Sequence, residues 1–394
     1  MKALQDIVVL DLTRVLAGPY AGMMLADMGA DVIKVEARLK GDDSRAFGPY
    51  VEGESCYFMS LNRGKRSITI DMKKEEGKEL VKRLAAKADI LLENFRGGTM
   101  DKLGLGYDVL KEINPRLIYV STTGFGATGP YKTDPAYDVI VQGMGGLMSI
   151  TGQEGGEPTR VGASVGDITA GLFSAIGALG ALHARTLTGK GQFIDVSMLD
   201  CQVAILENAI SRYLNAGIIP QPIGNRHPSI TPFESFKAKD GYVIIAVGND
   251  TLWAKFCKLI GHDEWITDER FNSNANRTAN QPVVKELLTP IFAEKTAAEW
   301  ISSLKEIGVP VGPINNVAQI IEDPSIKARD MIVSVEHPVA GHISMPGIPI
   351  KMSDTPGTIE RPAPVLGQHN HEILTQVLGL DDNEIKKLEE DEVI

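Results

Sequence analysis

The alternation of apolar runs with helix-like segments in the first part of the chain constrains the fold most strongly. Largely apolar runs with the length of strands occupy residues 7–12, 31–36, 67–71, 89–94 and 116–121. Segments with helical patterns lie between several of them, at 18–28, 75–88 and 100–113. Because strands that are apolar on both faces must be buried on both faces, this order predicts an α/β fold with a parallel sheet covered by helices on both sides.

The organisation changes after about residue 200. Residues 201–216 have a helical pattern, and the proline-broken stretch at 219–222 is typical of a linker. A hairpin over 233–247 and three helices, at 252–260, 282–292 and 297–307, predict a smaller α+β unit. The tail is rich in Pro and Gly over 333–367 and is predicted to finish in a helix at 371–378.

Length and charge limit the domain number and the partners. A chain of 394 residues suggests two or three domains. Its formal net charge of −11 argues against nucleic acid as a partner, because no overall cationic field exists to neutralise phosphates. A small anionic ligand needs only a local basic patch, so the net charge does not exclude one.

The cysteines, the histidines and the apolar runs bear on compartment and metal content. The three cysteines lie far apart, so we expect reduced thiols in a cytoplasmic protein. The seven histidines lack the spacing of metal ligands, so we expect no metal site. The N-terminus has no leader pattern, and no apolar run reaches the length of a membrane span, although residues 170–184 come nearest. No membrane contact is therefore expected.

Basic side chains stand where the predicted strands end. In sheets of this kind, ligands bind beyond the carboxyl ends of the strands. Arg14, Arg38, Lys73 and Arg96 follow four different strands in a protein that is acidic overall. Their grouping predicts an anionic ligand with phosphate groups. For any single one of these residues, a solvated surface charge is the alternative.

No nucleotide motif accompanies the predicted sheet. Lys65 and Arg66, just before the third strand, add to the basic set. The turn after the first strand, at 13–19, lacks the GxGxxG pattern, and no GxxxxGK[ST] motif occurs in the chain. The absence of both patterns disfavours NAD, FAD and P-loop nucleotides as the ligand.

Asp167 lies in a stretch of small residues, 162–171, with glycine on both sides. Glycines allow backbone to approach a ligand closely. The apolar run at 170–184 predicts a buried helix behind Asp167, whose positive dipole end would help to keep the carboxylate ionised. Two roles are therefore open for Asp167: a helix cap, and a reactive carboxylate presented to a ligand.

Further short motifs occur in a fixed order along the chain. They stand at residues 10–19, 29–36, 62–67, 93–98, 124–130, 165–167, 188–192 and 224–228. On these motifs the chain resembles the class III CoA-transferases, the CaiB/BaiF or formyl-CoA-transferase-like family, over essentially its full length.

The resemblance implies a catalytic role for Asp167, which stands at the family's catalytic aspartate. In the family this carboxylate attacks a donor thioester, and transfer proceeds through an aspartyl mixed anhydride and an aspartyl-CoA thioester. Acyl-CoA and a carboxylic acid are then the expected substrates, and no cofactor is permanently bound. The CoA contacts implied by motif position are Val15, Leu16, Ala17, Arg38, Ile70, Lys73, Asn94, Phe95, Arg96, Thr99, Lys102 and Tyr137.

The implied contacts divide by chemistry, and a few positions depart from the family. The basic residues of the set would meet phosphates, whereas Tyr137 would lie nearer the thioester. Thr123 and Pro135 replace lysines of some relatives. Leu16 stands where some members have a polar residue beside the acyl group, so this position is expected to influence substrate choice.

The resemblance also implies an architecture. A Rossmann-like large domain would comprise residues 1–216 and 331–394, with a linker and a smaller domain at 217–330 between them. In the family two subunits interlock as a homodimer through long linkers. The proline-broken stretch and the Pro- and Gly-rich tail fit such linkers.

Two alternatives and the substrate stay open. An α-methylacyl-CoA racemase would need a histidine in the segment 134–138, which has none, and Tyr137 is a poor base. A catalytically silent CoA-binding protein would have no need of Asp167. Arg14, Arg226 and His227 are candidates to hold a second carboxylate, as in succinyl-CoA or another short dicarboxylate, but structural or CoA-directed roles are equally open for them.

Overall fold

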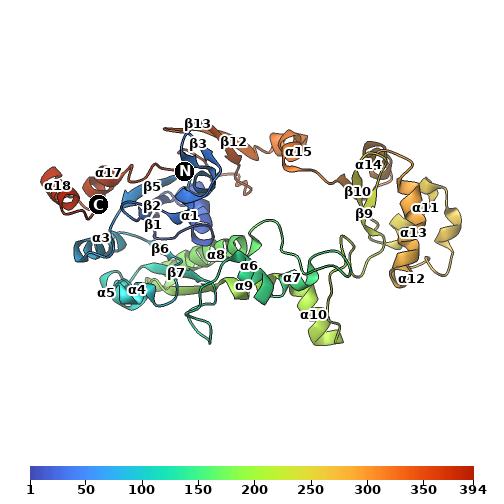
Figure 1. The fold of residues 1–394 in the computed structure, drawn as a ribbon, viewed down its shortest axis with the longest axis horizontal. Helices are drawn as coiled ribbons and strands as arrows, with labels where there is room; N and C mark the ends of the chain where they lie inside the picture. The colour runs from blue at the N-terminus through green and yellow to red at the C-terminus, as the bar shows by residue number, and fades with distance from the viewer. The chain divides into compact units, whose positions relative to one another are not determined.

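A six-stranded parallel sheet organises the larger part of the molecule (Figure 1). The computed structural model describes residues 1–394, and its sheet order is β5-β2-β1-β6-β7-β8. Every neighbouring pair in the sheet is parallel. The order runs outward from β1 on one side and from β6 on the other, which is the doubly wound arrangement of Rossmann-type folds. The strands are β1 (Val8–Asp11), β2 (Asp31–Glu36), β5 (Lys65–Thr69), β6 (Ile90–Glu93), β7 (Ile118–Thr123) and β8 (Phe193–Ser197).

Both faces of the sheet are buried, as predicted. Leu10 of β1 packs in a core with residues of α3 (Glu75–Ala85), α5 (Tyr107–Ile113) and α17 (Asn370–Gln376). Its neighbour Val9 points to the opposite face and packs in a second core. That second core contains residues of α1 (Ala17–Asp27), α8 (Val165–Thr188) and α9 (Met198–Ile205). The predicted parallel sheet with helices on both sides is therefore confirmed.

The five predicted strands are all present, with ends that differ by at most two residues. The sixth strand, β8, was not predicted, because Asp195 interrupts its apolar residues and the strand lies at the exposed edge of the sheet. The predicted helix at 100–113 is two helices, α4 (Thr99–Lys102) and α5. Gly104, at φ +68°, separates them. A left-handed residue cannot continue an α-helix, and this explains the break.

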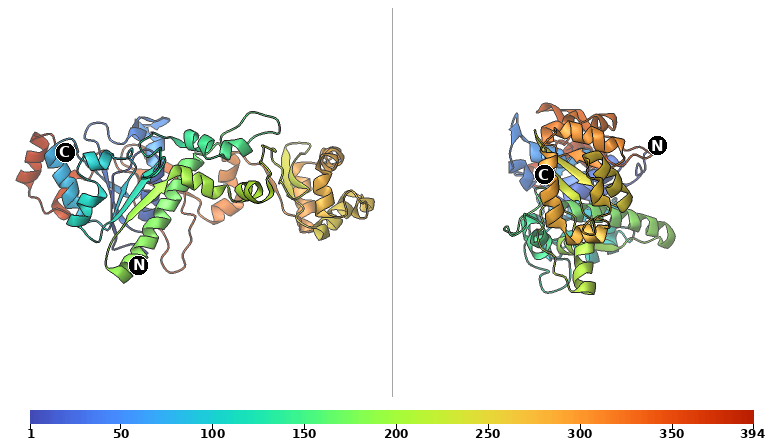
Figure 2. Two further views of the ribbon diagram at one scale, coloured as in Figure 1. Left: turned by 90° about the horizontal axis from the view of Figure 1, so that it is seen from below. Right: turned by 90° about the vertical axis from the view of Figure 1, so that its right-hand side faces the viewer.

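The long helix α8 begins five residues before the predicted 170–184 run and is the green helix beside the sheet in Figure 2. By length and composition it is apolar enough to cross a membrane, contrary to the expectation that no segment is. It packs instead against α1, α6 (Asp138–Met144), α9 and β7. A Cβ atom on its Gly171 would lie 2.7 Å from the Ala17 carbonyl oxygen, so glycine is what permits this close approach of α8 to α1.

The C-terminal part of the chain returns to the larger unit. β12 (Ile332–His337) and β13 (Gly341–Pro346) form an antiparallel hairpin that was not predicted in the Pro- and Gly-rich tail. Ile343 and Met345 pack against Phe58 of α2 (Cys56–Leu61). The predicted final helix is confirmed as α17, and α18 (Asp382–Glu390) follows it.

A second compact unit comprises Ser149–Thr159 and Ile219–Pro324; the larger unit comprises Met1–Met148, Arg160–Ile218 and Ser325–Ile394. The division differs from the predicted boundaries chiefly at 149–159, which group with the smaller unit. Its predicted hairpin is confirmed as β9 (Phe233–Lys237) and β10 (Tyr242–Ala246), with β11 (Val311–Pro313) beside β10. The predicted helices are α11 (Asp250–Ile260), α13 (Gln281–Phe292) and α14 (Ala297–Glu306), which enclose an aromatic core with Trp253 and Trp300.

The remaining elements are short. They are the 3₁₀ helices η1 (Asp43–Ala46) and η2 (Asp263–Ile266), the strands β3 (Tyr50–Val51) and β4 (Glu54–Ser55), and the helices α7 (Leu147–Ile150), α10 (Glu207–Ala216), α12 (Asn274–Ala279), α15 (Val317–Glu322) and α16 (Pro324–Ala328).

Candidate active site

A cavity of about 210 Å³ lies at the carboxyl ends of β1, β6 and β7, where the direction of the strand order reverses. This is the place at which doubly wound sheets bind their ligands. The predicted site residues that line it are Val15, Leu16, Ala17, Asn94, Phe95, Arg96, Tyr137 and Asp167. These residues come from separate segments of the chain, so the fold assembles them.

The other predicted contacts do not line this cavity. Arg38 donates from Nε to the Ile394 carbonyl oxygen at 2.9 Å and lies 3.4 Å from the Glu392 carboxylate. Ile70 is buried in the core below α3. The predicted CoA contacts that lie elsewhere on the larger unit are Arg38, Ile70, Lys73, Thr99 and Lys102. Of these, Lys73 and Lys102 are exposed.

Two members of the predicted basic set have structural partners instead. The buried Lys65 ammonium lies 2.8 Å from the Asp11 carboxylate. Arg66 is ion-paired with Asp31 and Glu372. The expectation that both residues contribute to an anion-binding rim is therefore wrong, because their charges are already neutralised inside the protein.

Buried charges support the loop that follows β1. Val15 has a φ of +66°, which is unusual for a β-branched residue, and its N–H donates to Asp42 Oδ1 at 3.0 Å. Asp42 Oδ2 lies 2.8 Å from the Lys34 ammonium, which also donates to the Thr13 carbonyl at 2.9 Å. Burial would raise the pKa of Asp42, but the Lys34 ammonium and the N–H donors hold it well below its usual range. A charged Asp42 thus fixes the strained loop against the cavity.

Asn94 fixes the same loop from the end of β6. Its Oδ1 accepts the Arg14 N–H at 2.8 Å, and its Nδ2 donates to the Arg14 carbonyl at 2.8 Å. The Arg14 guanidinium lies 5.0 Å from the Phe95 ring and 3.1 Å from the Asp43 carboxylate. Asn94 therefore uses its whole amide to position backbone, and the charge of Arg14 is partly balanced by Asp43.

Asp167 is the third residue of α8 and is partly exposed towards the cavity. The helix begins after Ser164, so Asp167 is not its capping residue, and its carboxylate accepts no hydrogen bond from another side chain or from the backbone. Burial, followed by the nearby Asp138 carboxylate, raises the pKa of Asp167 to about 7. Burial and like charge therefore outweigh the favourable effect expected from the helix N-terminus, and the carboxylate is only partly ionised near neutral pH.

Two residues near Asp167 were missed in the sequence. Asp138, the first residue of α6, accepts the Gly166 N–H at 2.8 Å and so contacts the turn that carries Asp167. Burial and the carboxylates of Asp167, Asp42 and Asp138 raise the pKa of Tyr57 to about 12. Asp138 directly follows Tyr137, so its position was a usable signal, whereas nothing in the sequence pointed to Tyr57.

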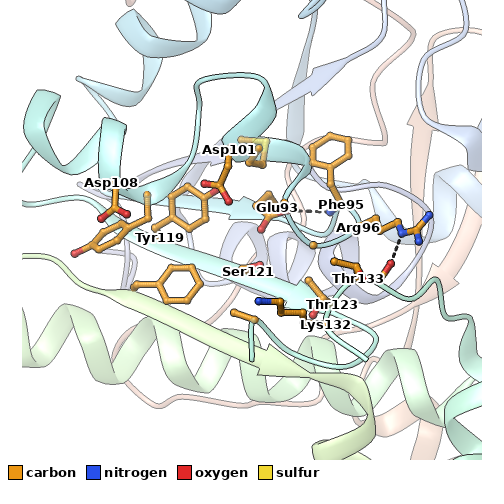
Figure 3. A pocket seen from close by; sticks show the side chains of 16 residues that line it. Glu93, Phe95, Arg96, Asp101, Asp108, Tyr119, Ser121, Thr123, Lys132 and Thr133 are labelled. Carbon is orange, nitrogen blue, oxygen red and sulfur yellow. Dashed lines mark hydrogen bonds between the residues drawn. The ribbon is translucent and has the colours of Figure 1, made fainter. Parts of the chain in front are cut away.

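A second cavity, of about 360 Å³, adjoins the first and shares Phe95, Arg96, Gly97 and Thr123 with it (Figure 3). Glu93 faces this cavity and accepts the Phe95 N–H at 2.9 Å, and burial raises the pKa of Glu93 to about 7. Asp101 and Asp108 add two further carboxyl groups to the lining. Arg96 and Lys132 line the same cavity, so it also offers two cationic side chains.

The structure contains no group of three or more His, Cys, Asp or Glu side chains arranged to hold a metal ion. Arg226 and His227 lie in the smaller unit, where Arg226 Nη2 is 3.3 Å from the Glu154 carboxylate. Neither residue lines the cavity that contains Asp167. The ionisable side chains that line this cavity are Arg14, Asp43, Arg96, Asp134, Tyr137 and Asp167.

Comparisons with known proteins agree over nearly the whole chain. The sequence model of the family described as CoA-transferase family III matches residues 4–370. The chain is 45% identical to the acetyl-CoA:oxalate CoA-transferase of Acetobacter aceti, with 92% of each chain covered. It is 41% identical to the succinyl-CoA:glutarate CoA-transferase of Mus musculus, covering 98% of this chain and 89% of that protein. A solved CaiB/BaiF family protein from Brucella suis is 44% identical, with a TM-score of 0.85 over 95% of this chain and 99% of that one.

Proposed function

This chain belongs to CoA-transferase family III, and from that premise we propose that Asp167 is the nucleophile that carries the acyl group and CoA between donor and acceptor. The observation that carries the proposal is the placement of Asp167. Its carboxylate faces the cavity at the strand ends without a hydrogen-bond partner, and its pKa is raised to about 7. A carboxylate whose pKa is raised is a better nucleophile once ionised, and a substantial fraction of it is ionised near neutral pH.

The proposed reaction has four steps. A carboxylate oxygen of Asp167 attacks the acyl carbon of the donor, and the C–S bond breaks with its electron pair leaving on the CoA sulfur. The thiolate attacks the Asp167 carbonyl carbon of the resulting anhydride and expels the donor carboxylate. The acceptor carboxylate then attacks this Asp167 thioester and expels CoA thiolate. The thiolate finally attacks the acceptor acyl carbon, which yields acceptor-CoA and the original Asp167 carboxylate.

Each step passes through an oxyanion that needs hydrogen-bond donors. The first turn of α1 borders the cavity at Leu16 and Ala17 and has no side-chain cap. The N–H groups of Ala17 and Gly18 donate no hydrogen bond within the protein, as is usual for the first turn of a helix. We assign them as oxyanion donors, with Asp42 and Asn94 holding the preceding loop in place.

For the substrate we propose succinyl-CoA as donor and a short dicarboxylic acid as acceptor. Relatives with names such as succinyl-CoA:glutarate and succinyl-CoA:mesaconate CoA-transferase support this class. Arg14 lines the cavity and offers a cation for a distal carboxylate in competition with Asp43. A screen of donors and acceptors, read as CoA esters by chromatography, tests the assignment. Transfer confined to monocarboxylates would contradict it.

Covalent capture tests the nucleophile directly. Incubation with succinyl-CoA alone, followed by hydroxylamine, is expected to convert the Asp167 side chain into a hydroxamate that mass spectrometry finds in its peptide. Asp134 and Asp43, which also line the cavity, serve as internal controls that should stay unmodified. Exchange of the α-proton in deuterated solvent without acyl transfer would support the racemase alternative, although the relatives reported above are transferases.

The acylation rate is expected to depend on pH with a midpoint near 7. Only the ionised carboxylate attacks, so below the midpoint the single-turnover rate should fall about tenfold per pH unit.

The same titration affects stability, because the pKa of Asp167 is raised from 3.8 to about 7. The folded state therefore binds this proton more tightly, and the contribution of Asp167 to stability declines as the pH rises from about 4 to about 7. Stopped-flow acylation and denaturant unfolding across this pH range measure the two effects. A flat rate profile between pH 6 and pH 8 would contradict the assignment.

We also propose a homodimer in the cytoplasm. On α8, Phe173, Ile176 and Leu187 are 40%, 61% and 78% exposed, which leaves part of an apolar helix available to a second copy of the chain. The three cysteines are unpaired, which suits a reducing compartment. Light scattering of the purified protein tests the dimer, and a monomer at micromolar concentration would exclude it.

A further inference from the structure

Asp138 is the centre of a buried hydrogen-bond network next to Asp167. Its side chain is buried at the start of α6, and Oδ1 accepts the Gly166 N–H at 2.8 Å. Its Oδ2 accepts from Gln142 Nε2 at 2.8 Å, and Gln142 Oε1 accepts the Val161 N–H at 2.9 Å. The network thus connects α6 both to the first turn of α8 and to the loop that precedes it.

At this point, side chains of α6 lie directly against the backbone of α8. A Cβ atom on Gly166 would lie 2.7 Å from Val141 Cγ2 and 2.9 Å from Asp138 Oδ1. Any larger residue at position 166 would therefore push α6 away from the turn that carries Asp167. The Asp138 carboxylate is consequently held beside the residue that immediately precedes Asp167.

We infer that Asp138 is a positioning residue that also places a second negative charge beside Asp167, a charge whose repulsion is relieved when Asp167 becomes acylated. The inference rests on the proposed role of Asp167 as nucleophile. A neutral amide would satisfy the Gly166 N–H equally well, so the hydrogen bond alone does not require an acid at this position. The negative charge of the Asp138 carboxylate acts on Asp167, and a neutral amide at position 138 would have no such effect.

That effect follows from the charge balance of the first step. Attack by Asp167 forms an O–C bond and breaks the C–S bond, and the negative charge of Asp167 leaves on the CoA thiolate. The anhydride and the later thioester at Asp167 are neutral. Repulsion from Asp138 therefore acts on the free carboxylate and not on either covalent intermediate, so it favours acylation. The raised pKa of Asp167, to which Asp138 contributes after burial, agrees with this.

Other charged or titratable groups surround Asp167 without the same effect. Tyr57 is close enough for the Asp167 charge to raise its pKa. Of all the charged side chains around Asp167, Asp138 is the one whose charge shifts the pKa of Asp167. The charged or titratable groups that line the cavity with Asp167 are Arg14, Asp43, Arg96, Asp134 and Tyr137.

A pair of variants separates charge from hydrogen bonding. Asp138→Asn removes the charge and keeps an acceptor for the Gly166 N–H, but its amide meets the amide of Gln142. The double variant Asp138→Asn with Gln142→Glu restores complementary partners, because the new carboxylate at position 142 can accept both from the new amide at position 138 and from the Val161 N–H. The double variant keeps the net charge and moves it one turn along α6, so it is the matched control for folding and total charge.

Two properties of Asp167 are measured as a function of pH. Hydroxylamine trapping after a single turnover gives its acylation rate, and ¹³C NMR of the aspartate carboxyls gives its ionisation. The wild-type midpoint is expected near 7. In Asp138→Asn the midpoint moves to lower pH, and the acylation rate above pH 8 falls severalfold, while CoA binding is unchanged. The midpoint stays above the ordinary aspartate value, because burial remains. The double variant regains wild-type thermal stability but keeps a lowered midpoint.

Two results would overturn the inference. One is a wild-type midpoint in both variants with a uniform loss of rate at every pH, which would make Asp138 purely structural. The other is full recovery of the midpoint in the double variant, which would make the position of the charge unimportant. If Asp138→Asn does not fold, the double variant alone decides. If wild-type protein yields no Asp167 hydroxamate, the proposed nucleophile is wrong, whereas the NMR titration still tests the effect of Asp138.

Discussion

Replacing Asp167 by alanine is expected to lower kcat for CoA transfer by at least about 10⁴-fold, as removal of a covalent nucleophile does in other enzymes. The carboxylate forms both covalent intermediates of the proposed reaction, so neither intermediate can form at position 167 without it. The side chain makes no hydrogen bond within the protein, so CoA binding and the thermal unfolding midpoint should be retained. At pH 8 the variant should be at least as stable as wild type, since a buried charge beside Asp138 is removed. Steady-state kinetics, CoA titration calorimetry and thermal unfolding measure the three properties.

The matched control for this variant is Asp200→Ala. Asp200 is also the third residue of a helix, α9, and also lies in the first turn after a serine. It is exposed and does not line the cavity. We expect its kcat to stay within about twofold of wild type, because an acidic residue in a first helical turn contributes only modestly to stability. Near-normal turnover by Asp167→Ala would refute the covalent mechanism.

The second large effect is expected from Asp42→Ala. The substitution leaves the buried Lys34 ammonium without its 2.8 Å partner and removes the acceptor of the Val15 N–H. Breaking a buried ion pair from one side costs about 3–5 kcal/mol of the free energy of unfolding. The Val15 loop should also lose its left-handed conformation, which moves Leu16 and Ala17 and lowers kcat/KM. Urea unfolding monitored by circular dichroism, together with acylation kinetics, measures both losses.

Two control variants accompany Asp42→Ala. Asp42→Asn keeps an acceptor for Val15 and loses only the charge, so its stability should lie between those of wild type and Asp42→Ala. Glu390→Ala removes an exposed ion pair with Lys386 and should leave the unfolding midpoint unchanged. Because the pKa of Asp42 is lowered in the folded state, its stabilisation is present above the unfolded pKa of about 3.8 and is lost as the pH falls below it. An Asp42→Ala protein that unfolds like wild type at pH 7 would contradict the assigned role.

The order of strands and helices was readable in the sequence because buried parallel strands must be apolar on both faces. The runs at 7–12 and 116–121 are mostly apolar, which fits strands that are buried on both faces. The hairpin β12–β13 was not readable, because its strands bury only alternate residues and lie in a stretch dominated by Pro and Gly. The edge strand β8 was missed for the same reason, since strands that are only partly buried carry a weaker signal.

The candidate site divides in a similar way. Residues next to strand ends, such as Val15 and Asn94, could be found because the fold class fixes where ligands bind. The charges of Lys65 and Arg66 were misread, because sequence does not show which acidic residues neutralise them. The raised pKa of Asp167 depends on burial and on Asp138, which is distant along the chain, so no local pattern contained it.

The discontinuity of the larger unit has a consequence for biosynthesis. The core below α3 includes Leu10 from the first strand together with Ile373 and Val393 near the end of the chain. The main part of the smaller unit, Ile219–Pro324, is translated before α17. During that time this face of the nascent sheet has no α17 to cover it. The smaller unit has its own aromatic core and can condense earlier. Until its last helices emerge, the nascent chain therefore leaves part of this apolar sheet face uncovered, and we expect it to be prone to aggregation at that stage.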